Sequence, residues 1–182
     1  KAVWALRNQS LKPEDRSGVW RFRELLPDLP PKMIVSRREG NTPLYRPEEF
    51  PETNRWLGAQ NVYYKHLGFN PTGSFKDYGM TVAMSVAKKN GAKLIGCAST
   101  GNTSASAASY ARRAGIRCFV LIPDDATALG KVAQALAYGA MTIRVRGGFD
   151  DCHELLMAGR ERFGYAVVNS DNPFRLEGQK TI

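Results

Sequence analysis

Residues 70–80 read NPTGSFKDYGM and place one lysine, Lys76, where a turn-rich segment meets a helix. The NP and TG pairs are turn and helix-breaker signals. Ser74 and Asp77 have the spacing of a capping box, so we expect a helix to open at Ser74 with Lys76 in its first turn. A lysine there faces the positive end of the helix dipole, which predicts a lowered pKa and a more nucleophilic amine.

A neutral lysine amine suits Schiff-base chemistry, either with a carbonyl substrate or with pyridoxal phosphate. A surface lysine near a helix start is the commoner meaning of such a residue when it stands alone. The neighbouring motifs therefore decide between the two interpretations.

Beyond Lys76 the chain alternates helical and strand-forming segments at intervals of about 24 residues. The helical segments are each expected to end at a glycine, namely Gly91, Gly115, Gly139 and Gly164. A short apolar strand is expected to begin just after each of them, near Lys93, Arg117, Met141 and Tyr165. This alternation predicts an α/β fold with β-α units, a parallel sheet and right-handed crossovers. In such sheets ligands bind beyond the carboxyl ends of the strands.

Two polar segments fall at that edge of the predicted sheet. The segment 99–103, STGNT, follows a strand and opens a helix, so it can bind an anion, cap the helix, or do both. Asn169, Ser170 and Arg175 follow the last predicted strand. An arginine fork with amide and hydroxyl donors suits a phosphate, although an ordinary capping loop with an exposed arginine fits the same residues.

Four separated motifs carry a resemblance to a known family: GNTPL at 40–44, TGSFKD at 72–77, STGNTSAS at 99–106 and NSDNPFRLEGQKT at 169–181. In this order they resemble the fold type II family of pyridoxal-phosphate enzymes, and within it most closely the threonine synthases. The likeness runs from about residue 16 to the end of the chain. It implies an incomplete fold of the tryptophan synthase β type. In that fold, residues 1–70 are an N-terminal arm and the first part of a large domain, 71–175 a smaller α/β domain, and 176–182 the return to the large domain.

The resemblance also implies a role for each motif. Lys76 binds pyridoxal phosphate and moves protons, and Phe75 and Asn102 contact the cofactor, with Asn102 bonding its 3-oxygen. The substrate-binding residues are Ser99, Thr100, Asn102 and Thr103 for the carboxylate, and Asn169, Ser170 and Arg175 for the phosphate. The implied reaction converts O-phospho-L-homoserine and water to L-threonine and phosphate, by γ-elimination and β-addition of water.

Two alternatives remain open at this point. A lyase of the threonine or serine dehydratase type would share the lysine and the asparagine loop, and would differ in the phosphate-binding set. The chain could also be a non-catalytic fragment or binding module of such an enzyme. The glycine-rich loop that holds the cofactor phosphate in this family is not found up to Ile182, so we expect the N-terminal part of a longer enzyme that is inactive as residues 1–182.

Composition bounds the remaining function classes. The net charge of +9 invites a nucleic-acid role, but the basic pairs precede helix-ending glycines, where cations complement the helix dipole, so we expect no nucleic-acid site. The acidic run at 150–154 is interpreted as a helix start and not as a metal site. Without a membrane-spanning apolar run or a signal peptide, we expect a cytoplasmic protein, and the resemblance implies a homodimer.

Overall fold

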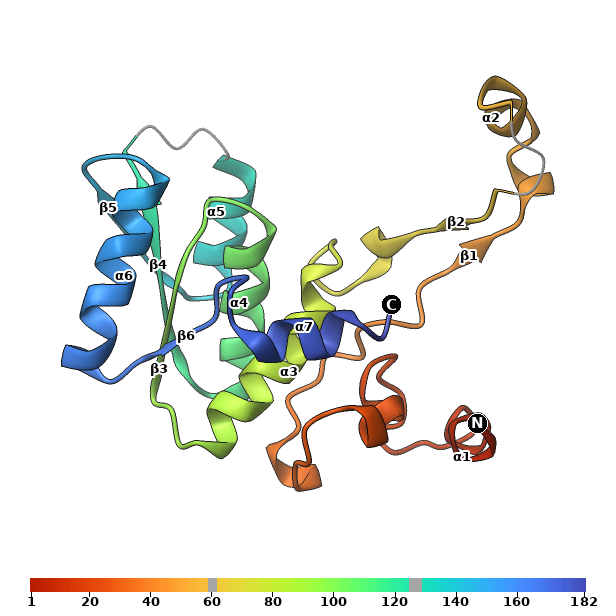
Figure 1. Ribbon diagram of the computed structural model, residues 1–182, viewed down its shortest axis with the longest axis horizontal. Helices are drawn as coiled ribbons and strands as arrows, with labels where there is room; N and C mark the ends of the chain where they lie inside the picture. The colour runs from red at the N-terminus through yellow and green to blue at the C-terminus, as the bar shows by residue number, and fades with distance from the viewer. Residues whose placement is uncertain (59–61, 125–128) are drawn as a thin grey trace.

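The computed structural model describes residues 1–58, 62–124 and 129–182 (Figure 1). The chain divides into an extended N-terminal segment and an α/β body. The first segment carries short elements: α1 (Ala2–Arg7), η1 (Trp20–Leu25), η2 (Pro31–Met33), β1 (Leu44–Tyr45), η3 (Pro47–Glu49), α2 (Pro51–Trp56), β2 (Tyr64–Lys65) and η4 (Leu67–Phe69). Strands β1 and β2 pair antiparallel and form an arm that projects from the body.

The body alternates helices and strands as the sequence predicts. Its elements are α3 (Lys76–Lys89), β3 (Leu94–Ala98), α4 (Asn102–Ala114), β4 (Arg117–Pro123), α5 (Leu129–Ala137), β5 (Met141–Val145), α6 (Phe149–Phe163), β6 (Ala166–Val167) and α7 (Pro173–Gln179). The four strands lie in the order β5-β4-β3-β6 and every pair is parallel. The predicted α/β class and parallel sheet are therefore confirmed.

Glycines end the helices because they adopt a backbone conformation that other residues avoid. Gly115 follows α4 with φ of 72°, and Gly164 follows α6 with φ of 65°, both in the left-handed region. Each lets the chain reverse within a few residues and enter the next strand. The positions of these glycines thus set the spacing of the β-α units.

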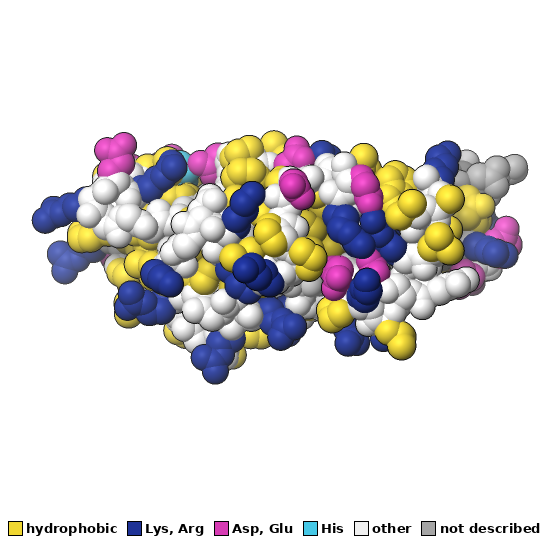
Figure 2. Space-filling model, turned by 90° about the horizontal axis from the view of Figure 1, so that it is seen from below, with side chains coloured by type: hydrophobic (Ala, Val, Ile, Leu, Met, Phe, Trp, Pro, Cys, Tyr) yellow, Lys and Arg dark blue, Asp and Glu magenta, His cyan; other side chains and the backbone are white. Residues whose placement is uncertain are grey.

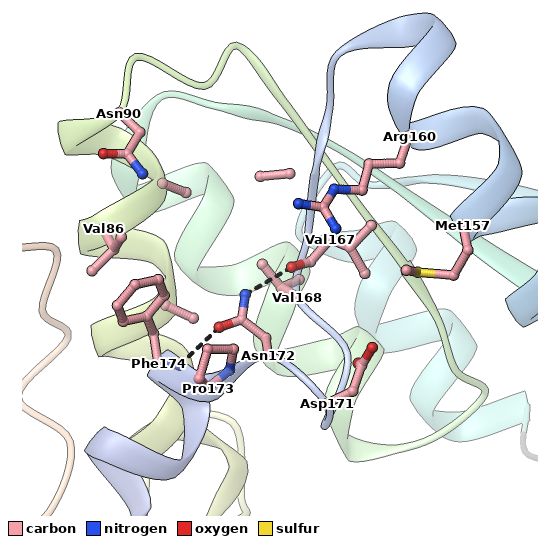
Figure 3. A pocket seen from close by; sticks show the side chains of 13 residues that line it. Val86, Asn90, Met157, Arg160, Val167, Val168, Asp171, Asn172, Pro173 and Phe174 are labelled. Carbon is pink, nitrogen blue, oxygen red and sulfur yellow. Dashed lines mark hydrogen bonds between the residues drawn. The ribbon is translucent and has the colours of Figure 1, made fainter.

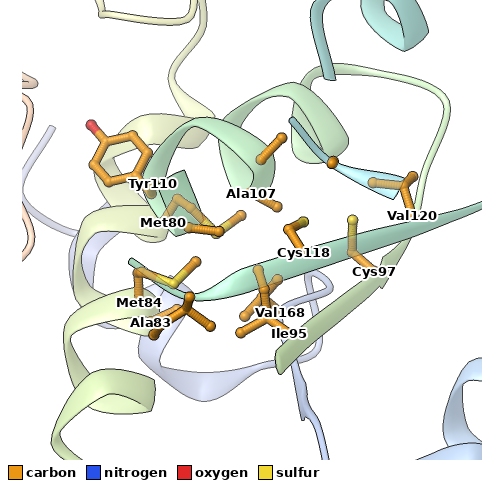
Figure 4. Close-up of a cluster of buried hydrophobic side chains, with 14 of the residues drawn as sticks. Met80, Ala83, Met84, Ile95, Cys97, Ala107, Tyr110, Cys118, Val120 and Val168 are labelled. Atoms are coloured by element: carbon orange, nitrogen blue, oxygen red, sulfur yellow. The ribbon is translucent and has the colours of Figure 1, made fainter. Parts of the chain in front are cut away.

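The main core lies between the sheet and helices α3, α4 and α5 (Figure 4). Met80 and Met84 of α3 pack there with Ile95 and Cys97 of β3. A second cluster lies on the opposite face, where Leu156 of α6 covers the sheet. Burying one side chain of leucine size contributes about 2 kcal/mol to the free energy of unfolding, so both layers stabilise the sheet.

The N-terminal segment is fastened to α3 by a buried tryptophan. Trp20 is 1% exposed, and its Nε1 donates to Thr81 Oγ1 at 2.8 Å. Thr81 Oγ1 in turn donates to the Val35 carbonyl at 2.6 Å. The segment also folds closely on itself, because a Cβ on Gly18 would lie 2.3 Å from the backbone nitrogen of Asn41. The parts of the N-terminal segment around Trp20 and Val35 therefore pack against α3.

The basic residues on the face drawn in Figure 2 are mixed with other side chains. Figure 2 shows Lys and Arg side chains spread along the visible face, with acidic and apolar side chains between them. As predicted, basic pairs occupy the last turns of three helices: Lys88 and Lys89 in α3, Arg112 and Arg113 in α4, and Arg160 and Arg162 in α6. There they stabilise the negative helix ends.

Within the described ranges, none of the helices combines the length and the apolar character needed to cross a bilayer. The same residues hold no cluster of three or more His, Cys, Asp or Glu side chains suited to a metal ion.

Candidate active site

Lys76 is the first residue of α3 and is partly buried. Its Nζ lies over the ring of Phe75, 4.3 Å from the ring centroid. Burial and the nearby Arg175 guanidinium lower the pKa of Lys76, because both disfavour a second positive charge. The sequence predicts the same direction from the helix end alone. In the structure, the larger part of the lowering of the Lys76 pKa comes from the burial of its side chain.

The predicted capping box is wrong. The helix begins at Lys76 and not at Ser74, and Ser74 Oγ accepts a bond from the Lys76 backbone nitrogen at 3.2 Å. Asp77 does not turn back toward Ser74. Its carboxylate is fully buried and accepts bonds from Thr72 and from Ser106 of α4. Burial decides this outcome, since a carboxylate enclosed between helices binds the nearest donors in space.

The STGNT segment leads from β3 into α4, as predicted. The helix begins at Asn102, after Gly101, which has no side chain to cap it. Gly101 N donates to Ser99 Oγ at 3.1 Å, so the turn holds itself in shape. The first backbone amides of a helix have no partner within the helix, and they point toward any anion placed there.

A cavity of about 370 Å³ joins this segment to the loop after β6. Ser99 and Thr103 line one side, and Asn169 and Ser170 line the other. The structure therefore brings together two motifs that lie about 70 residues apart in sequence. Thr100 and Asn102 belong to the same segment but are not among the lining residues, and both are partly buried.

Two of the polar lining residues were not predicted as site residues. His153 of α6 and Asp171 after β6 lie at the cavity, with His153 Nε2 3.9 Å from Asp171 Oδ2. The sequence presented His153 only as part of the acidic run at 150–154. His153 lies one turn into the helix that follows β5, and that helix starts at the carboxyl edge of the sheet. This position in the sequence could have predicted that His153 lies near the site.

The Asn169 side chain is used structurally. Its amide donates to the Ala98 carbonyl at 3.1 Å, and its oxygen accepts from Ala98 N at 3.0 Å. It thus continues the β3–β6 pairing beyond the end of the strands. These two bonds use the amide oxygen and one of the two amide hydrogens, so one N–H of Asn169 is left to donate to a ligand.

Arg175 is a charged residue of the body whose side chain is fully buried. It is 0% exposed, so the alternative of an exposed arginine is wrong. Nη1 donates to the Val168 carbonyl at 3.0 Å, while Nε and Nη2 have no partner among the described groups. Buried donors without a partner are costly, and they mark a place where a ligand can supply the missing acceptor.

Two neighbours hold Arg175 in place. A Cβ on Gly79 would lie 3.0 Å from Arg175 Nε, so this glycine of α3 makes room for the guanidinium. Asn172 caps α7 by accepting from Phe174 N at 2.9 Å, and donates to the Val167 carbonyl at 2.8 Å (Figure 3).

The cavity drawn in Figure 3, about 320 Å³, contains none of the predicted site residues.

Residues 35–182 match the model of a family described as pyridoxal-phosphate dependent enzyme. The chain is 52% identical to the threonine synthase of Methanocaldococcus jannaschii over 166 residues, which cover 91% of this chain and 40% of that protein. It is 50% identical to the threonine synthase of Synechocystis sp. over 175 residues, which cover 93% of this chain and 45% of that protein. The chain thus spans less than half the length of these curated relatives.

Solved structures show the same fold. Maize serine racemase superposes with a TM-score of 0.71 at 21% identity, covering 91% of this chain and 48% of that one. The processed threonine deaminase isoform 2 of Solanum lycopersicum superposes with a TM-score of 0.67 at 25% identity, covering 78% and 38%.

Proposed function

This chain belongs to the family of pyridoxal-phosphate-dependent enzymes, and on that premise we propose that it is the N-terminal portion of a threonine synthase. Pyridoxal phosphate is thereby confirmed as the predicted cofactor. The observation that carries the narrower proposal is 46–52% identity to four threonine synthases across most of the chain. The reaction converts O-phospho-L-homoserine and water to L-threonine and phosphate.

The residues present fit an anionic aldehyde cofactor. Lys76 has a lowered pKa and is the amine that would bind the aldehyde. Phe75 lies beside it, and Asn102 stands at the start of α4 within the segment assigned to the cofactor's 3-oxygen. Once bound, the cofactor supplies an electron sink for the carbon bonded to the substrate amine. Lys76 is then positioned to take up and return protons.

The substrate has two anionic ends, and the site offers a donor set for each. The backbone amides and hydroxyls of residues 99–103 suit the carboxylate. Two donors are proposed for the phosphate: the Ser170 hydroxyl, which lines the cavity, and Arg175, which does not line it but whose Nε and Nη2 have no partner among the described groups. Arg175 would stabilise the phosphate as it leaves, because a fixed cation offsets the charge that develops on the leaving group.

The test is Lys76→Ala in the full-length protein. We expect loss of the visible absorbance of the lysine-bound cofactor and loss of threonine formation from O-phospho-L-homoserine. Lys88→Ala is the matched control, since Lys88 lies in the last turn of the same helix and donates to the Lys32 carbonyl. A Lys76→Ala protein with the absorbance and turnover of the wild type would contradict the proposal.

A dehydratase is the alternative that the fold permits, because threonine deaminase is among the structural neighbours. The two functions differ in their products. Phosphate and threonine from phosphohomoserine support the synthase, whereas ammonia released from threonine without phosphohomoserine turnover would support the dehydratase. The buried Nε and Nη2 of Arg175, which have no partner among the described groups, favour a phosphorylated substrate.

We propose that residues 71–175 are the smaller domain of the enzyme, and that the complete protein is a cytoplasmic homodimer. Residues 1–182 contain no glycine-rich phosphate cradle of the kind that this family uses. We therefore expect residues 1–182 alone to release no phosphate from phosphohomoserine, which an activity assay of this fragment beside the full-length protein would check.

A further inference from the structure

The residue after the candidate catalytic lysine is a fully buried carboxylate. Asp77 is the second residue of α3, is 0% exposed, and reaches α4 with its carboxylate. Asp77 Oδ2 accepts from the Thr72 backbone nitrogen at 2.8 Å, and Oδ1 accepts from Thr72 Oγ1 at 2.7 Å and from Ser106 Oγ at 2.6 Å. The carboxylate therefore has three donors and caps neither helix.

These bonds join the two segments assigned to cofactor and substrate. Thr72 lies in the turn that delivers the chain to Lys76, and Ser106 lies one turn into α4, which opens with Asn102. A single side chain thus ties the lysine turn to the helix that carries the asparagine segment. A change in this tie would alter the position of Lys76 relative to Asn102.

The turn before Lys76 is also held from α5. Lys131 Nζ and Gln134 Nε2 donate to the Thr72 carbonyl at 3.2 and 3.3 Å. The backbone nitrogen, carbonyl and hydroxyl of Thr72 are thereby all engaged. Gly73 follows with φ of +78°, a conformation that allows the chain to turn sharply toward Lys76.

A carboxylate is the side chain that this position needs. Burial raises the pKa of Asp77, while the bonds from Ser106 and Thr72 and the positive charge of Arg37 oppose that change. All three partner groups act as donors, so an acceptor-only group satisfies each of them. An asparagine could accept from the Thr72 backbone nitrogen and donate to the two hydroxyls, but all three bonds would then be neutral, and bonds to a charged group are the stronger ones.

We propose that Asp77 is a positioning residue that fixes Lys76 relative to the start of α4 by fastening the turn at Thr72 to Ser106. This inference rests on the proposed function, in that Lys76 is taken as the residue that binds pyridoxal phosphate. It assigns Asp77 no contact with cofactor or substrate. Its effect is on how well Lys76 is aimed at the cofactor.

The test measures cofactor binding, not turnover. Full-length apo protein carrying Asp77→Asn is titrated with pyridoxal phosphate, and the bound cofactor is then fixed with borohydride and located by mass spectrometry. We expect the Kd to rise by about tenfold and the fixed fraction on Lys76 to fall, because all three bonds lose their charged acceptor. Ser106→Ala removes one bond and should raise the Kd by about threefold. It also serves if Asp77→Asn fails to fold.

Asp15→Asn is the matched control for simple loss of stability. Asp15 is 6% exposed and accepts from Arg23 Nη1 at 2.6 Å, within the N-terminal segment. We expect it to lower the Tm and leave the Kd for pyridoxal phosphate unchanged. Equal changes in Kd for Asp15→Asn and Asp77→Asn would overturn the positioning role.

A wild-type Kd in both Asp77→Asn and Ser106→Ala would overturn it as well, because Asp77 would then matter for stability alone. Lys76→Ala separates this inference from the proposed function. If Lys76→Ala still fixes cofactor at the wild-type level, the assignment of Lys76 fails. If Lys76→Ala loses the cofactor while Asp77→Asn binds it normally, the positioning role fails by itself.

Discussion

Replacing Arg175 with methionine removes a buried guanidinium and keeps a long apolar side chain. In the native protein, Nη1 bonds the Val168 carbonyl at 3.0 Å, and Nε and Nη2 have no partner among the described groups. Methionine fills much of the same space without carrying donors into the interior. The substitution therefore separates what Arg175 contributes to stability from what it contributes to substrate binding.

The substitution should change stability much less than it changes catalysis. Losing the bond to the Val168 carbonyl costs about 1 kcal/mol, and removing a buried cation with unmade bonds offsets a similar amount, so the free energy of unfolding should change by less than about 1 kcal/mol. Losing charge-assisted bonds to the substrate phosphate should cost about 2 kcal/mol in transition-state stabilisation. That is a fall of about thirtyfold in kcat/KM for phosphohomoserine.

The pH dependence of cofactor attachment should change too. Arg175 lowers the pKa of Lys76, so its removal raises that pKa toward the ordinary value. At a given pH a smaller fraction of Lys76 is then neutral. We expect the rate at which pyridoxal phosphate attaches to Arg175→Met apo protein to reach its plateau at a higher pH than in the wild type.

Phosphate release under steady-state conditions, Tm measurements and attachment rates across pH check these expectations. Arg160→Met is the control, because Arg160 is exposed in the last turn of α6, away from the candidate site. A variant that loses several kcal/mol of stability while keeping its kcat/KM would refute the reasoning, since Arg175 would then be a structural residue only.

Two further substitutions test the packing that supports the site. Gly178→Ala should lower the free energy of unfolding, measured by urea denaturation, by about 2 to 3 kcal/mol, because the new Cβ would lie 2.0 Å from the Tyr78 carbonyl oxygen. Gly130→Ala in α5 is the control: its Cβ would meet no atom within 4 Å, so the substitution should be neutral or stabilising. Leu156→Ala should cost about 3 kcal/mol by the same measurement, because Leu156 is 0% exposed, and the 51% exposed Leu155 should tolerate alanine at a cost of less than about 1 kcal/mol.

The β-α repeat could be predicted because its signals are local. Each glycine that ends a helix acts through its own backbone, as Gly115 and Gly164 do, and the apolar run that follows forms a strand in any parallel sheet. The order of the polar segments along the sheet edge then follows from topology. Hence the sequence predicts Ser99 and Ser170 at one edge of the sheet, and both residues line the same cavity.

The details of the site depended on contacts between distant segments. Asp77 has the spacing of a cap, but the donors that it binds include Ser106, 29 positions away. Asn169 looks like a free amide in the sequence, yet it pairs with the Ala98 backbone, 71 positions away. The burial of Arg175 also depends on Gly79 in another helix. Local spacing cannot reveal which partner lies nearest in space.

The contact of α7 with α3 has a consequence for the synthesis of the protein. A Cβ on Gly178 would lie 2.0 Å from the Tyr78 carbonyl oxygen, so the two helices touch backbone to backbone across about a hundred residues of chain. At translation rates of about 5 to 20 residues per second, α3 leaves the ribosome about 5 to 20 seconds before α7 can cover it. During that interval the face of α3 around Tyr78 and Gly79 is open to water and to chaperones. The lysine turn therefore reaches its final environment only when the last of these helices has been made.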